Sequence, residues 1–152
     1  MSATRIELPN WESLELLGLT TVGRLCIIDH GYPLAFPLNY RLLHDPTRIV
    51  FRTNPSSALA HYEGPASLEV DHIDLLHVSA WSIIVRGTLR RVVENHELAD
   101  THPLVTAGRF HWVVLEATSV SGRRFTAETR EDAFTVEWQP VAADPPEPPN
   151  RS

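Results

Sequence analysis

The sequence is poor in cysteine. Cys26 is the only cysteine among 152 residues, so no disulfide can form within the chain. It lies in the apolar run Leu25–Ile28, where a buried and unreactive thiol is expected. A protein without disulfides suits a reducing compartment, and residues 1–11 contain no apolar run of signal-peptide length. We therefore expect a cytoplasmic protein.

The sequence also lacks an excess of positive charge. It has 13 Lys and Arg residues against 19 Asp and Glu residues, which gives a formal net charge of −6. Nucleic acids and anionic lipid surfaces both require a basic footprint, so neither is an expected partner. No stretch approaches the roughly 18 consecutive apolar residues of a membrane-spanning helix. Any recognition of an anion must therefore be local.

Several motifs of catalysis and metal binding are absent as well. The sequence has no G-x-G-x-x-G, G-x-x-x-x-G-K-[ST], G-x-S-x-G or H-E-x-x-H pattern. Acidic residues are scattered singly, so the sequence offers no candidate pair of carboxylates for acid–base catalysis. The best metal candidate is His72-x-Asp74-x-x-His77, but its spacing matches no standard metal site. The favoured interpretation is that these are ordinary polar residues of a loop. We expect no bound metal ion, and no catalytic acid or base can be assigned.

The composition is that of one globular domain. Apolar residues make up 43% of the sequence and charged residues 21%. Residues 140–152 are rich in proline and poor in apolar side chains, which is typical of a disordered tail. We therefore expect a single domain over residues 1–139, followed by this tail.

Alternating apolar residues predict six or seven strands with short connections. The expected strands cover 22–29, 32–42, 48–53, 66–73, 81–94 and 109–116. A seventh would follow a turn at Ser121–Gly122 and cover 121–128. Such a pattern predicts an all-β fold with minor α content, either an antiparallel barrel or a sandwich.

Local signals add short helices and irregular points. Short helices are expected at 11–17 with Asn10 as the N-cap and Gly18 as the stop, at 58–62, and at 95–103 with Asn95 as the cap. Pro33 and Pro37 cannot donate ladder hydrogen bonds, which predicts a free edge or a bulge in the second strand. Gly87 predicts a bend in the fifth strand.

Polar and aromatic residues gather along the predicted strands. Arg52 and Thr53 precede Ser56, Ser57 and the short helix at 58–62. A guanidinium, hydroxyls and a helix N-terminus form a plausible anion site, although on this stretch alone a serine that simply caps the helix is the favoured interpretation. Further candidates of this kind are Asn39, Trp81, Ser82, Arg86, His111, Arg123 and Arg124. Together they suit a ligand with a flat apolar body and an anionic end, such as flavin mononucleotide.

Six sequence blocks, taken in order, resemble the pyridoxamine 5′-phosphate oxidase-like FMN-binding split-barrel family. The blocks are GRL (23–25), GYPLAFPLNY (31–40), IVFRT (49–53), SLEVDHID (67–74), WSIIVRG (81–87) and HWVVLEATSVSGRR (111–124). They cover most of residues 11–125. The resemblance implies an antiparallel split barrel that forms a homodimer, with the flavin in a cleft at the subunit interface.

The resemblance also implies roles for individual residues. The strand from Pro37 to Tyr40 would run along the isoalloxazine ring, and Arg52 with its neighbours would approach the phosphate. Trp81 and Ser82 would line the far side of the cleft, and His111 or Arg123 would reach in from the partner subunit. The expected cofactor-binding residues are therefore Pro37, Leu38, Asn39, Tyr40, Arg52, Thr53, Ser56, Ser57, Trp81, Ser82, His111 and Arg123.

One departure from the family pattern bears on the cofactor. Relatives usually carry a lysine near the start of the helix after F-R-T, whereas this chain has Ser57-Ala58-Leu59. Loss of an ammonium group beside a phosphate costs about 1.5–3 kcal/mol, an order of magnitude or more in affinity. FMN is the expected cofactor, and FAD or the deazaflavin F420 are the alternatives.

The expected function is that of a flavin-dependent oxidoreductase that acts on an unidentified small molecule. The cofactor would carry the electron transfer, which suits a sequence without an evident acid or base. Oxidation of pyridoxamine phosphate is less expected, because no second cluster of basic residues is available for a substrate phosphate. The alternative is a non-catalytic protein that binds or senses a flavin or a tetrapyrrole product.

Overall fold

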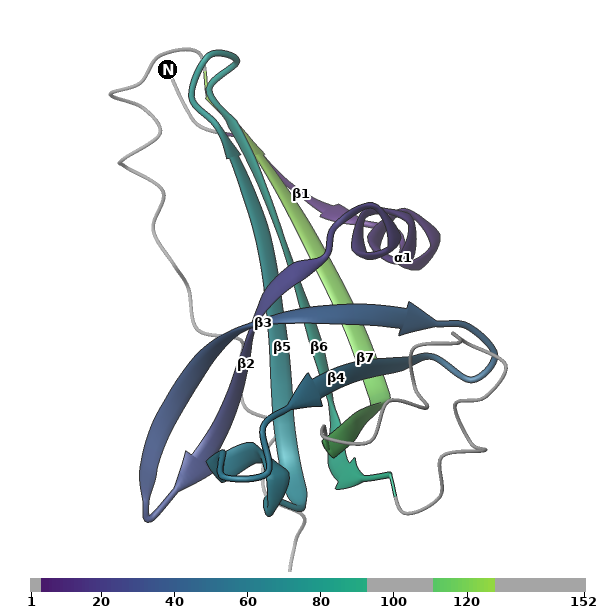
Figure 1. Cartoon of the computed structure of the whole chain (residues 1–152). Helices are drawn as coiled ribbons and strands as arrows, with labels where there is room; N and C mark the ends of the chain where they lie inside the picture. Colours follow the sequence, from purple (N-terminus) through teal and green to yellow (C-terminus); the bar gives the residue numbers. More distant parts are fainter. Residues whose placement is uncertain (1–3, 93–110, 128–152) are drawn as a thin grey trace, which may run out of the picture.

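The computed structural model describes residues 4–92 and 111–127 (Figure 1). The elements are β1 (Thr4–Leu8), α1 (Asn10–Leu19), β2 (Val22–Asp29), β3 (Tyr32–Leu43), β4 (Arg48–Thr53), the 3₁₀ helix η1 (Ala58–Ala60), β5 (Gly64–Asp74), β6 (Ser79–Arg91) and β7 (His111–Thr126). Every strand pairing is antiparallel, which confirms the predicted all-β class.

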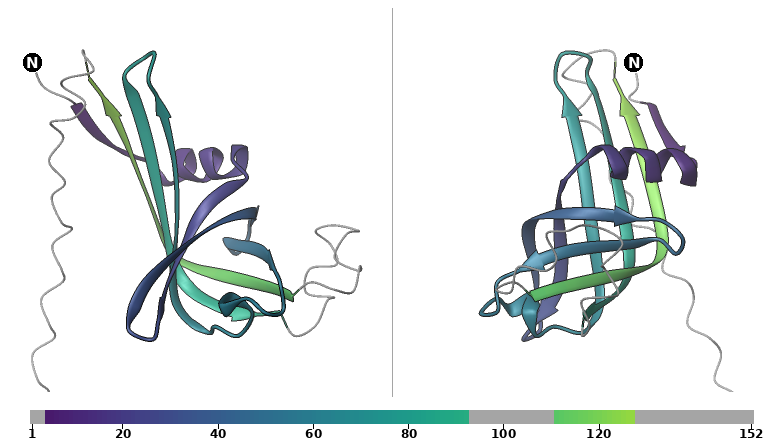
Figure 2. Two further views of the ribbon diagram at one scale, coloured as in Figure 1. Left: turned by 60° about the vertical axis from the view of Figure 1, so that its left-hand side comes forward. Right: turned by 45° about the vertical axis from the view of Figure 1, so that its right-hand side comes forward.

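Most of the strands close into a split barrel. The order around the barrel is β7-β4-β3-β2-β5-β6, and β6 pairs again with β7 to complete the circle. The strands β5, β6 and β7 continue past the barrel as a projecting ribbon, while β3 and β4 cross lower down (Figures 1 and 2). β4 pairs with residues 111–116 of β7, and β1 pairs with residues 122–126 on the same edge.

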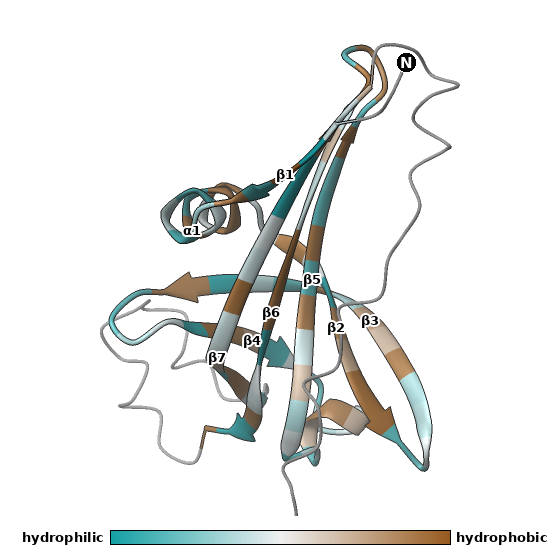
Figure 3. Ribbon diagram, turned by 180° about the vertical axis from the view of Figure 1, so that it is seen from behind, coloured by the Kyte–Doolittle hydropathy of each residue, from teal (hydrophilic) through white to brown (hydrophobic). Residues whose placement is uncertain are grey.

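Alternate residues of each strand fill the barrel interior. Ile49 and Phe51 of β4 and Ile83 and Val85 of β6 are fully buried, and Leu17 of α1 joins the same core. The alternation of apolar and polar residues along β5 and β7 is visible in Figure 3. A period of two is what a strand requires when one face meets the core and the other meets solvent.

Tyr40 fastens α1 to the barrel. Its hydroxyl donates to the carbonyl of Leu17 at 2.8 Å and lies 2.5 Å from the hydroxyl of Thr20. The Thr20 hydroxyl also lies 3.0 Å from the carbonyl of Leu16, to which it donates. These bonds use carbonyl groups that the end of a helix leaves without intrahelical partners.

The two predicted irregular points of the barrel strands are confirmed. Among the described strands, residues 32–39 of β3 have a neighbour on one side only, which is β2. The amide of Tyr40 donates to Thr21 at the end of β2, so the odd-numbered positions of β3, including Pro33 and Pro37, face the free edge. The β6–β7 register shifts at Gly87, where a Cβ would overlap the carbonyl of Glu116.

Other local predictions were wrong. Helix α1 starts at Asn10 itself, with Pro9 in the N-cap position and no side-chain cap, and it passes through Gly18 to Leu19. The helix expected at 58–62 is only the three-residue η1. No turn interrupts Ser121–Gly122, because β7 is one continuous strand paired with β6 along its length.

The strand β1 was not predicted, since its five residues are mostly exposed and carry little apolar pattern. Gly122 is not a turn residue but a point of close packing, because a Cβ there would overlap the hydroxyl of Ser13 in α1. The predicted helix at 95–103, the tail at 140–152 and the strand residues 93–94, 109–110 and 128 lie outside the described residues. Within the described ranges, no helix combines the length and apolarity needed to cross a bilayer.

Candidate functional site

The candidate site begins where β3 and β4 separate. The pair Tyr40–Phe51 is the last in the register of these strands, and both side chains face the core. Asn39 and Arg52 are the next residues on the two strands, and both are exposed. Because side chains alternate between faces, Asn39 and Arg52 lie together on the outer face, beside the free edge of β3.

The segment after β4 carries the two predicted serines. The side-chain oxygen of Asn54 accepts hydrogen bonds from the amide and the hydroxyl of Ser56, both at 3.1 Å. The Ser57 hydroxyl oxygen accepts from the amide of Leu59 at 3.2 Å and so caps η1. A three-residue helix has little dipole, so the positive character of this segment depends on Arg52.

Thr53 and His111 form a cross-strand pair at the end of β4 and β7. Thr53 is only 6% exposed and its hydroxyl lies 3.5 Å from the carbonyl oxygen of Asn54. His111 is half-buried. Both residues occupy inward-facing positions in the alternation of their strands. Their side chains are therefore directed away from the face that carries Arg52.

Three other predicted residues also occupy inward positions. Tyr40 and Leu38 belong to β3, and the hydroxyl of Tyr40 is engaged by α1. Burial raises the pKa of Tyr40, so its phenol stays protonated. Trp81 is half-buried against the core, with its ring 6.2 Å from that of His72 between centroids. Pro37, by contrast, is exposed on the outer face.

Ser82 and Arg123 pair with one another on the outer face of β6 and β7. From β3 to β6 there are three interstrand spacings, about 14 Å in all. The structure therefore separates these two residues from Asn39 and Arg52 within one protomer. The neighbouring Arg124 is half-buried and forms an ion pair with Glu12 of α1 at 2.6 Å.

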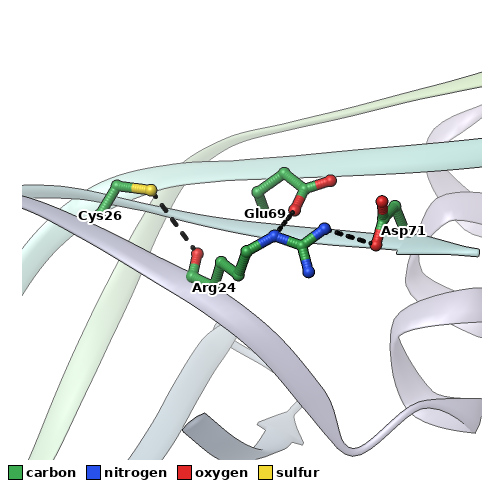
Figure 4. A network of polar contacts seen from close by, with 4 residues as sticks. All are labelled: Arg24, Cys26, Glu69 and Asp71. Carbon is green, nitrogen blue, oxygen red and sulfur yellow. Dashed lines mark hydrogen bonds and ion pairs between the residues drawn. The ribbon is translucent and has the colours of Figure 1, made fainter. Parts of the chain in front are cut away.

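The sequence did not single out a charged cluster between these two groups. Arg24 of β2 contacts Glu69 at 3.2 Å and Asp71 at 2.8 Å, both on β5 (Figure 4). The two carboxylates raise the pKa of Arg24. Burial raises the pKa of Glu69, Asp71 adds to the effect, and Arg24 opposes it. We call Arg24, Glu69 and Asp71 the Arg24 cluster.

Apolar and polar residues alternate in VGRLCIID and SLEVDHID, which places Arg24, Glu69 and Asp71 on outward positions. The register that pairs Arg24 with Glu69 cannot be read from the sequence. Cys26 lies on the same face. It is half-buried, whereas the sequence predicted a buried thiol. Its thiol donates to the carbonyl of Arg24 at 3.8 Å, and burial raises the pKa of Cys26, which keeps the thiol protonated and slow to react.

The histidine and aspartate residues near 74 have a local role. The Asp74 carboxylate lies 2.6 Å from the ring nitrogen Nδ1 of His77 and accepts from the amides of Leu76 and His77. These hydrogen bonds hold the turn between β5 and β6 and lower the pKa of Asp74, with the His77 side chain as the largest cause. No group of three potential metal ligands is found in the described part of the chain.

Comparison with known proteins places the chain in a family. The family profile described as pyridoxamine 5′-phosphate oxidase matches residues 9–136. The FAD-binding protein from Mycobacterium smegmatis is 27% identical, with a TM-score of 0.67 over 80% of this chain and 99% of that chain. A conserved protein of unknown function from Corynebacterium diphtheriae is also 27% identical, with a TM-score of 0.68 over 80% and 98%.

No curated protein sequence matches the chain. The family profile nevertheless spans most of its residues, and the solved structures share its strand arrangement over nearly their full length. The chain belongs to the pyridoxamine 5′-phosphate oxidase-like split-barrel family.

Proposed function

We propose that the protein binds a flavin along the free edge of β3 and serves as an oxidoreductase for a small molecule. The observation that carries the proposal is the edge at 32–39, unpaired among the described strands and adjoining Arg52. The relative from Mycobacterium smegmatis is an FAD-binding protein with the same fold, which supports a flavin as the ligand.

The chemistry of the edge fits an isoalloxazine ring. The odd-numbered positions face outward, so Ala35 offers both an amide N–H and a carbonyl, and Asn39 offers an amide N–H. Pro33 and Pro37 offer carbonyl groups only, and they prevent another strand from pairing there. One edge of the ring carries an N–H group between acceptor atoms, so it can use both kinds of partner. The exposed face of Pro37 and the side-chain amide of Asn39 add apolar and polar contacts.

The phosphate of the cofactor would lie near Arg52, with Ser56 and Ser57 as hydroxyl partners. All 13 basic residues of the chain are arginines, so no other lysine replaces the one that relatives carry at the position of Ala58. A single guanidinium predicts weaker binding of a monophosphate than in those relatives. We propose FMN as the cofactor, with FAD and F420 as alternatives that direct titration distinguishes.

Bound flavin would supply the transfer of a hydride or of single electrons. The chain itself would bind the ring through backbone groups, orient it by the rigid strand β3, and neutralise part of the phosphate charge through Arg52.

A non-catalytic binding protein is the second candidate, and Ala58 favours it because weak phosphate contacts suit a ligand that exchanges. Reduction by a nicotinamide and reoxidation by an added acceptor would distinguish the enzyme from the binding protein.

We also propose that the functional unit is a homodimer. Ser82 is about 14 Å across the sheet from Asn39 and Arg123 is one strand farther, so a second copy would be needed to bring such residues against the same ligand. Exposed apolar residues near the site support a partner surface, since Leu19 is 76% exposed and Val22, opposite Asn39, is 55% exposed.

The replacement Arg52→Ala tests the proposed phosphate contact. We expect flavin affinity to fall at least tenfold, because a charge-assisted hydrogen bond to phosphate contributes about 1.5–3 kcal/mol. Arg5→Ala, which removes an exposed arginine from β1, is the matched control and should leave affinity unchanged. Affinity is read from flavin fluorescence and folding from the thermal midpoint. Equal affinity of wild type and a folded Arg52→Ala would remove Arg52 from the site.

A further inference from the structure

The Arg24 cluster lies directly beside the proposed ring site. Arg24 is the cross-strand partner of Pro37 on one side and of Glu69 on the other. Residues opposite one another in an antiparallel pair have Cβ atoms about 4.5–5.5 Å apart. The row continues from Glu69 to Ile84 of β6 and then to Ser121 of β7, all on the outer face. A molecule placed against Pro37 therefore has Arg24 as its next neighbour.

The two carboxylates fix the guanidinium without covering it. Nε of Arg24 contacts Glu69 and one Nη contacts Asp71, while 49% of the Arg24 side chain remains exposed (Figure 4). A guanidinium has five N–H groups, and the two contacts leave other N–H groups able to donate outward. A long side chain normally loses rotamer freedom on binding a ligand, but here the carboxylates have already removed it.

The cluster is a hydrogen-bond donor with an unfavourable charge for anions. One guanidinium and two carboxylates give a formal charge of +1 − 2 = −1 on adjacent outward positions. A neutral carbonyl, quinone or nitro oxygen gains a hydrogen bond there without repulsion. A carboxylate, sulfonate or phosphate at the same place meets a net negative charge within several ångströms.

We propose that the Arg24 cluster is the specificity-determining element of the site and selects a neutral substrate bearing a carbonyl, quinone or nitro oxygen over an anionic one. This inference deepens the proposed function and rests on the ring site at Pro37. It also provides a structural reason, independent of any missing phosphate site, why pyridoxamine phosphate would be a poor substrate.

Two nitroaromatic probes of the same ring test the selection. We use 4-nitrobenzyl alcohol as the neutral probe and 4-nitrobenzoate as the anion, and measure both dissociation constants by equilibrium dialysis against the full chain, with and without FMN. Wild type should bind the alcohol about tenfold more tightly than the acid. The same ratio should appear in kcat/KM if the flavin-loaded protein turns these compounds over.

Variants of opposite charge separate electrostatics from loss of structure. The double replacement Glu69→Gln and Asp71→Asn changes the cluster charge to +1 and should shift the ratio toward 4-nitrobenzoate by at least tenfold. Arg24→Gln changes the charge to −2, so it should weaken the neutral probe and disfavour the anion further. The double replacement Glu15→Gln and Asp29→Asn also removes two negative charges, but from α1 and the far end of β2, and should leave the ratio unchanged.

The outcomes distinguish this inference from the proposed function. A ratio that is the same in wild type and in both cluster variants overturns the inference, as does preference of wild type for the acid or failure of wild type to bind either probe. Flavin affinity is measured separately on each protein. Absence of flavin binding with the expected ratio would refute the redox function alone, whereas normal flavin binding with an unchanged ratio would refute the selection alone.

Discussion

At the scale of single residues, Tyr40 shows how a residue of a ligand-binding motif can also be structural. The resemblance places Tyr40 beside a flavin ring, yet its hydroxyl lies between Leu17 and Thr20 and closes the end of α1. Its backbone remains on the strand that we propose for the ring. The side chain could not be assigned from sequence, because α1 and β3 are brought together only by the fold.

We expect Tyr40→Phe to lower the free energy of unfolding by about 1–2 kcal/mol, because the carbonyl of Leu17 loses a buried donor. Chemical denaturation measures the change. Tyr32→Phe is the control, since Tyr32 is 72% exposed and its hydroxyl has no such role. Equal stability of the two variants would show that the bonds to α1 contribute little.

At the scale of elements, the sequence predicted strands better than their ends. Period-two alternation identified β2 to β6 to within a few residues, and the prolines correctly indicated the free edge of β3. The continuity of β7 was missed, because Ser121–Gly122 has the composition of a turn. The glycine is instead required by α1, which packs against it. Such a requirement comes from a contact distant in sequence, so no local pattern reveals it.

Alanine replacements of Gly87 and Gly18 compare the stability effect at a tightly packed glycine with that at an open one. Gly87→Ala should lower the free energy of unfolding by about 1–3 kcal/mol, because the new Cβ would overlap the carbonyl of Glu116 at the β6–β7 bulge. Gly18→Ala in α1 meets no atom within 4 Å and should raise stability by up to about 1 kcal/mol. Urea denaturation compares both. A tolerated Gly87→Ala would mean that the bulge rearranges at little cost.

At the scale of the whole molecule, the fold class followed from the strand pattern and the split barrel from the family resemblance. The closure of β6 on β7 and the register that assembles the Arg24 cluster did not, since both depend on pairing between distant segments. The candidate residues of the site were named from sequence, but their division between inner and outer faces and between two groups required the structure.

The proposed assembly makes a prediction at the same scale. Sedimentation equilibrium should give a species of twice the 17.1 kDa chain mass at micromolar concentration. Addition of flavin should favour that species further, because a ligand held between two copies binds the dimer better than the monomer. A monomer that binds flavin with full affinity would contradict the shared site.

Hydrogen exchange with and without flavin tests the central claim most directly, because it locates the ligand on the chain. We predict slower exchange in residues 32–39, where the outward amides of Ala35 and Asn39 would gain partners, and in residues 52–57 around Arg52. The β5–β6 turn near Asp74 serves as an internal reference. Unchanged exchange in both segments at a flavin concentration that saturates binding would contradict the account.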